Sequence, residues 1–108
     1  MEILTRTDEI LLLAILRLGD DAYGISIAKE ITRRTGKVIK LGALWVLLDI
    51  AYQKGLVSKR TGDPTPQRGG RSKIFYRLTP EGCEALENAR ELSRVLWRGL
   101  PQSIKDLS

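Results

Sequence analysis

The stretch LVSKRTGDPTPQRGGRSKIFYRLTPEG, residues 56–82, separates a helical first half of this chain from its last helix. Residues 56–60 and 74–78 are rich in β-prone side chains and predict the two strands of a hairpin. The connection between them, residues 61–72, holds three glycines and two prolines. We therefore expect a long exposed loop, a wing, rather than a tight two-residue turn.

Three helices are predicted before this hairpin. Residues 7–18 have a capping threonine, acidic residues in the first turn and Gly19 just past the end. Residues 23–34 carry one apolar stripe and close at Gly36, and residues 41–54 repeat leucine at helical spacing. The first of these helices is apolar on every side. One packed neighbour cannot cover it, so we expect a second covering surface, which can belong to another subunit.

A fourth helix is predicted after the hairpin. Thr79 is the expected cap, Pro80 suits the first helical position, and the helix runs to about Arg98 with a wide apolar arc. The order of elements predicts a mainly α fold with a small β-hairpin, namely a winged helix-turn-helix plus a C-terminal dimerisation helix. We assign residues 1–78 to the winged-helix domain and residues 79–108 to the dimerisation helix and tail, within one compact domain.

The positive charge is concentrated in the hairpin. The chain has 18 Lys and Arg against 13 Asp and Glu, and residues 56–78 alone carry a net +5 while residues 1–55 carry +1 and residues 79–108 carry −1. This placement favours contact with a phosphate backbone, and arginines in a wing can enter a minor groove. A solvated loop that uses charge for solubility is the alternative interpretation. The cations of the hairpin are Lys59, Arg60, Arg68, Arg71, Lys73 and Arg77.

The composition argues against an enzyme. The chain has no histidine, which removes the commonest general base, the usual catalytic triads and most zinc sites. We expect no cofactor and no metal, and we interpret Cys83 as a buried thiol without a role. A single cysteine fits a reducing cytoplasm. The longest apolar run, residues 10–16, is far shorter than the roughly 20 residues that cross a bilayer, so we expect no membrane contact.

Three segments resemble one family. GGRSKIFYRLTPEG, residues 69–82, resembles the wing and the start of the final helix of PadR-like transcription regulators. LLLAILRLGDDAYGISIAKEI, residues 11–31, resembles their first two helices, and LGAL at 41–44 with KGLV at 54–57 brackets their third. The resemblance covers about residues 10–98.

The resemblance implies a cytoplasmic homodimer that binds double-stranded DNA. The fourth helix of each subunit would pack on the first helix of the other, and the third helices would enter successive major grooves. Some relatives bind planar aromatic effectors near a tryptophan of the last helix, where Trp97 lies, although we interpret Trp97 as dimer packing ahead of a small effector site. The expected dimer interface consists of Leu12, Ile15, Leu86, Ala89, Leu92, Leu96 and Trp97.

The third helix departs from the family. A step of about 100° per residue turns one side of this helix outward, and that side is largely apolar where relatives carry polar or charged residues. Bases and phosphates are contacted chiefly by hydrogen-bond donors and cations, and Asp49 repels phosphate. The outward positions are Trp45, Val46, Asp49, Ile50 and Gln53.

Two hypotheses follow. In the first, a DNA-binding repressor draws most of its affinity from the wing, and its contacts are Lys40, Gly42, Ala43, Trp45, Val46, Asp49, Lys59, Arg68, Arg71 and Lys73. In the second, the third helix has diverged or been engineered into a protein interface that builds a larger or mixed assembly, with DNA binding weakened or lost. That interface would consist of Trp45, Val46, Ile50, Tyr52 and Gln53. A third interpretation packs Trp45 and Ile50 under the wing.

Overall fold

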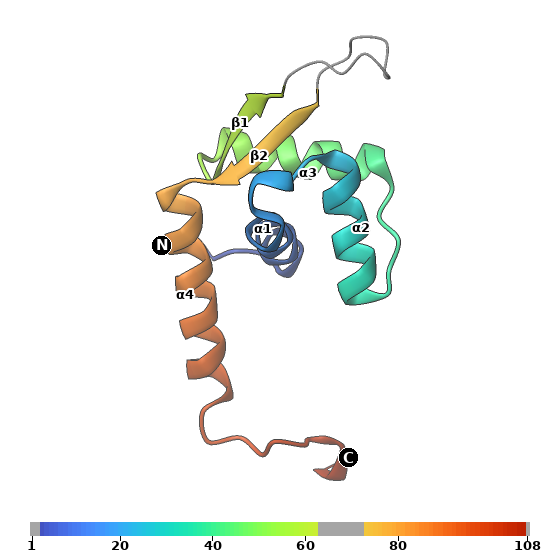
Figure 1. The fold of residues 1–108 in the computed structure, drawn as a ribbon. Coiled ribbons are helices and arrows are strands. Elements are labelled where there is room, and N and C mark those ends of the chain that lie inside the picture. The colour runs from blue at the N-terminus through green and yellow to red at the C-terminus, as the bar shows by residue number, and fades with distance from the viewer. Residues whose placement is uncertain (1–2, 63–72, 108) are drawn as a thin grey trace.

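The computed structural model describes residues 3–62 and 73–107. Helices α1, α2 and α3 come first, a two-stranded antiparallel hairpin follows, and α4 leaves the end of the hairpin (Figure 1). The predicted mainly α fold with a small hairpin is confirmed. The elements are α1 (Arg6–Leu18), η1 (Gly19–Asp21), α2 (Gly24–Thr35), α3 (Leu41–Gln53), β1 (Val57–Thr61), β2 (Ile74–Leu78), α4 (Pro80–Trp97) and η3 (Lys105–Leu107).

The helix ends follow the capping chemistry of the sequence, with one correction. The cap of α1 is Thr5, whose hydroxyl accepts a hydrogen bond from the Asp8 amide at 3.0 Å. The prediction that Thr7 caps this helix is wrong, because Thr7 already lies in the first turn and Thr5 has the extended backbone that a cap requires. Thr79 caps α4 as predicted, and its hydroxyl accepts from the Gly82 amide at 3.0 Å.

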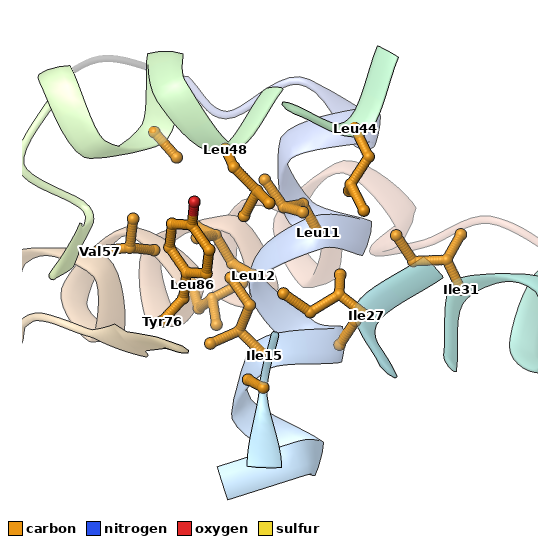
Figure 2. Close-up of a cluster of buried hydrophobic side chains, with 13 residues drawn as sticks. Leu11, Leu12, Ile15, Ile27, Ile31, Leu44, Leu48, Val57, Tyr76 and Leu86 are labelled. Carbon is orange, nitrogen blue, oxygen red and sulfur yellow. The ribbon is translucent and has the colours of Figure 1, made fainter. Parts of the chain in front are cut away.

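The hydrophobic core is built around α1. Figure 2 shows its side chains meeting those of α2, α3, the hairpin and the start of α4 in one cluster. Burying one such leucine or isoleucine stabilises the fold by about 1.5–3 kcal/mol. The fully buried large side chains are Leu11, Leu12, Ile15, Ile27, Leu44, Leu48 and Val57.

This core corrects part of the expected dimer interface. Leu12 and Ile15 are 0% and 1% exposed within the single chain, and Leu86 is also buried. The side chains of Leu12 and Ile15 fill the space between α1 and its own neighbours, so they have no surface to offer a second subunit. Leu86 is 8% exposed and lines a groove between α1 and α4. The exposed apolar residues of α1 are instead Leu13 and Leu16.

The hairpin is tied to the body by its backbone. Val57 pairs with Leu78 and Thr61 pairs with Ile74, and the Tyr76 amide donates to the Ala22 carbonyl at 2.8 Å. Side chains alternate across a strand. The side of Val57 and Tyr76 is buried against the core, and the side of Arg60, Phe75 and Arg77 faces the other way.

Helix α4 is held firmly only at its start. A side chain at Gly82 would collide with the Leu56 carbonyl, so this glycine allows α4 to approach the end of α3 and the start of the hairpin closely. Gly82 and Leu86 are the only buried residues of α4. Figure 1 shows the rest of the helix projecting away from the hairpin.

Candidate nucleic-acid interface

The outward side of α3 carries large apolar side chains, as the helical spacing predicted. Trp45, Val46 and Ile50 are 44%, 58% and 39% exposed, and Asp49 lies exposed between them in sequence. We call Trp45, Val46, Asp49 and Ile50 the α3 surface. The interpretation that packs Trp45 and Ile50 under the wing involves residues 63–72, which lie outside the described residues. Among the described residues, the Trp45 ring packs against Gly24, where a side chain would collide with it.

A groove of about 400 Å³ lies between α3 and β2. The α3 surface lines it together with Tyr76. The Asp49 carboxylate contacts Gln53 Nε2 at 3.5 Å, which is a weak hydrogen bond at best. Burial, with a smaller contribution from the negative charge of Asp49, raises the pKa of Tyr76 above its ordinary value. The groove therefore combines apolar walls with the Asp49 carboxylate and the Tyr76 side chain.

The first turn of α3 is exposed to solvent and has no side-chain cap. Lys40, Gly42 and Ala43 are exposed, no side chain caps this helix, and the space where a Gly42 side chain would lie is empty. The first amides of a helix lack intrahelical partners and lie at the positive end of the helix dipole. A backbone phosphate can approach such an end closely.

Lys59 joins the hairpin to α3. Its Nζ atom lies 4.0 Å from the centre of the Tyr52 ring, a cation–π contact between β1 and the last turn of α3. Among the described residues, no carboxylate forms an ion pair with Lys59. The contact places this cation beside the α3 surface.

The other described hairpin cations lie on the opposite side. Arg77 forms an ion pair with Asp20 at 2.6 Å, Arg60 lies 4.5 Å from the Phe75 ring, and Lys73 Nζ lies 3.9 Å from the Tyr23 ring. Lys59 and Lys73 therefore lie on opposite sides of the hairpin, although both belong to one set of DNA contacts predicted from the sequence. Arg68 and Arg71 lie outside the described residues.

The sequence did not predict the contacts that Asp20, Tyr23 and Phe75 make on this side of the hairpin. Tyr23 and Phe75 meet edge to face with ring centres 5.6 Å apart, and Asp20 and Arg77 are far apart along the chain. No local pattern connects residues at such a separation. Strand alternation alone could have placed Arg60 and Arg77 on one side of the hairpin.

A second apolar surface lies between α1 and α4. Leu13, Leu16, Leu96 and Trp97 are exposed, and we call them the α1/α4 surface. A groove of about 640 Å³ runs beside it and is lined by three of these four, Leu96 excepted. The charges nearby are paired within one helix, Arg90 with Glu87 at 3.7 Å and Arg94 with Glu91 at 2.9 Å.

The described residues contain no buried thiol, no candidate metal cluster and no helix suited to cross a membrane. Cys83 is exposed, which corrects the expectation of a buried thiol. Within residues 3–62 and 73–107, no group of three acidic, cysteine or histidine side chains could hold a metal ion. No helix in the same part of the chain is both long and apolar enough to cross a membrane.

The sequence profile of the transcriptional regulator PadR-like family matches residues 12–88. The chain belongs to this family. No curated protein sequence matches the chain. Membership identifies this PadR-like chain as a transcription regulator with a DNA-binding winged-helix fold, and not as an enzyme.

Solved structures agree with this assignment. A transcriptional regulator from Clostridium thermocellum is 25% identical, with a TM-score of 0.70 over 91% of this PadR-like chain and 92% of the other. A PadR family transcription regulator from hypervirulent Clostridium difficile is 27% identical, with a TM-score of 0.62 over 93% and 96% of the two chains. A winged-helix DNA-binding protein from STIV, 18% identical, has a TM-score of 0.67 over 91% and 98% and shows the shared fold alone.

Proposed function

We propose that this protein is a homodimeric repressor that binds double-stranded DNA with the α3 surface, the start of α3 and the hairpin. The contact of Lys59 with Tyr52 at 4.0 Å carries this proposal. A helix in the major groove turns its outer side to the bases, while cations beside it reach the phosphates. The position of Lys59 beside α3 supports such a phosphate contact.

The start of α3 supports the same orientation. Lys40 supplies a cation, and the amides of Gly42 and Ala43, which no side chain caps, can donate hydrogen bonds to a phosphate oxygen. Because the α3 surface itself has no cation, we attribute most of the affinity to these flanking contacts and to the wing, where Arg68 and Arg71 stand in the sequence. Repression follows if the bound protein covers a promoter, and a regulator of this kind would act in the cytoplasm.

The α1/α4 surface supports dimerisation. α4 is 18 residues long and buries only Gly82 and Leu86 within its own chain. Trp97 and Leu96 are exposed near its end, and Ala89 and Leu92 are half-buried in a smaller groove beside them. Exposed clusters of this kind, with their charges already neutralised, suit association of two copies. We therefore assign Trp97 to subunit packing ahead of an aromatic effector site.

Two measurements test this proposal. Light scattering at micromolar concentration is expected to give the mass of a dimer. Fluorescence anisotropy with a duplex is expected to show binding that weakens steeply between roughly 50 and 200 mM salt, because counterions are released from the phosphates. The absence of binding at the lowest salt, by a protein that is folded and dimeric, would contradict the DNA-binding role.

A second candidate is a protein-protein contact through α3. The observation that favours it is the exposure of Trp45, Val46 and Ile50 on one side of a helix, continued by exposed Tyr52 and Gln53. A two-fold dimer with a further apolar patch on each subunit can close into a larger assembly. Light scattering separates the candidates, since a particle larger than a dimer without DNA favours this one and a clean dimer excludes its homomeric form.

A further inference from the structure

The α3 surface has one charged side chain, and its chemistry limits what the helix can read. Asp49 lies on the same groove as Val46 and Ile50, and no cation among the described residues forms an ion pair with it. An ionised carboxylate only accepts hydrogen bonds. It is repelled by phosphates and by base edges that present acceptors.

The four bases differ in how they meet an acceptor flanked by apolar groups. Guanine presents only acceptors in the major groove, and thymine presents a methyl group beside the O4 acceptor. Adenine has a donor, but its N7 acceptor lies next to it. Cytosine presents the N4 amino donor without an acceptor, and carboxylates are known partners of that amino group.

We propose that Asp49 is the specificity-determining residue of α3, accepting a hydrogen bond from the N4 amino group of a cytosine while Val46 and Ile50 contact the neighbouring C5 position. This inference rests on the proposed DNA-binding function and names the base that α3 selects. The Gln53 amide lies 3.5 Å from the same carboxylate, one turn further along the helix. A methyl group at C5 adds apolar contact and removes no hydrogen bond, so 5-methylcytosine fits this surface at least as well as cytosine.

The test uses the full chain and a pool of duplexes with randomised central sequence. Repeated selection at low salt, followed by sequencing, gives the base preference at each position. The wild-type protein is expected to select cytosine at one position per subunit, and exchange of that C·G pair for T·A is expected to weaken binding about tenfold, within the range for a base-edge contact. The same duplex carrying 5-methylcytosine at that position is expected to bind equally or more tightly.

Asp49→Asn keeps the shape of the side chain, removes its charge and replaces one acceptor oxygen with an amide donor. Because an asparagine amide pairs best with adenine, the variant is expected to lose the cytosine preference to within about twofold, while its affinity for random duplexes rises because a charge that repels phosphate has gone. Asp21→Asn removes one exposed carboxylate outside α3 and is the matched control, expected to keep the cytosine preference. Val46→Ala is expected to remove any gain from 5-methylcytosine.

The outcomes separate this inference from the function on which it rests. Duplex binding with the same base preference in the wild type and in Asp49→Asn would overturn the inference and leave the DNA-binding role in place. A uniform rise in the affinity of Asp49→Asn would do so too, because Asp49 would then act only as a repelling charge. Weaker binding to 5-methylcytosine would overturn the role of Val46 and Ile50. No binding of any duplex would overturn both proposals, and a particle larger than a dimer would then indicate a protein partner for α3.

Discussion

The α3 surface and the α1/α4 surface expose similar apolar side chains, but they differ in whether the charged side chains beside them form ion pairs. Beside the α1/α4 surface, arginines pair with glutamates of the same helix, as Arg94 does with Glu91 at 2.9 Å. Beside the α3 surface, Lys59 lies over an aromatic ring. Among the described residues, neither Lys59 nor Asp49 forms an ion pair. Exposed apolar area therefore does not identify the partner of a surface by itself. The cation Lys59 favours DNA beside the α3 surface, and the paired charges beside the α1/α4 surface favour a neutral protein surface.

The largest expected effect is on the α1/α4 surface. Trp97→Ala removes an aromatic side chain that is 52% exposed in the single chain, and buried tryptophans at interfaces typically contribute about 2–4 kcal/mol to binding. We expect the dimer dissociation constant, measured by analytical ultracentrifugation, to rise by at least about 30-fold. Ile25→Ala, which shortens an exposed apolar side chain of α2, is the control. A variant that stays as tightly dimeric as the wild type would contradict the assignment of this surface.

The position of α4, and with it the α1/α4 surface, depends on a close approach at Gly82. Gly82→Ala places a methyl group against the Leu56 carbonyl, which belongs to the backbone and cannot move aside cheaply. We expect a loss of about 1–3 kcal/mol in the free energy of unfolding, measured in urea, as for other overpacked sites. Gly42→Ala on α3 meets open space and serves as the comparison. Equal stability of the two variants would show that the start of α4 does not need this close approach.

The third prediction concerns the α3 side. Lys59→Ala removes one proposed phosphate contact from each subunit, so we expect the slope of log affinity against log salt to fall by about 2 for the dimer. The dimer constant should not change. Lys29→Ala removes an exposed cation of α2 and is the control. An unchanged slope would remove Lys59 from the interface and with it the main support for DNA binding on this side.

The smallest expected effect lies away from both surfaces. Arg33 and Arg34 contact Glu30 at 2.6 and 2.9 Å, and their hydrogen bonds hold the pKa of Glu30 below its ordinary value. The ionised carboxylate therefore stabilises the fold at neutral pH, and this contribution is lost as pH falls through the lowered pKa. Glu30→Gln should lower the melting temperature slightly at pH 7.

Acid should remove that difference. As pH falls through the lowered pKa of Glu30, the wild-type carboxylate becomes protonated, so the melting curves of the wild type and Glu30→Gln, followed by circular dichroism, should approach each other. Glu84→Gln removes an exposed carboxylate of α4 and is the matched control. A difference that stays constant from pH 7 to acid would show that the ion pairs of Glu30 contribute nothing measurable. None of these changes should alter dimerisation or DNA binding.

Much of the candidate site could be predicted from the sequence because its placement is local. The spacing of Leu44 and Leu48 identifies the buried side of α3, and the same periodicity turns Trp45 and Asp49 outward. The buried side of α1 could not be predicted in this way. Its apolar residues surround the whole circumference, so the pattern could not tell that Leu12 and Ile15 are buried while Leu13 and Leu16 are exposed.

The amino-acid sequence by itself determined the order and type of the elements, the Thr79 cap of α4 and the excess charge of the hairpin. These depend on interactions between residues a few positions apart, which a linear pattern contains. Only the tertiary structure decided that Lys59 stands beside α3 while Lys73 faces the other way, and that Asp20 pairs with Arg77. Such contacts join residues that are distant along the chain, and their partners are chosen when the hairpin folds back onto the helices.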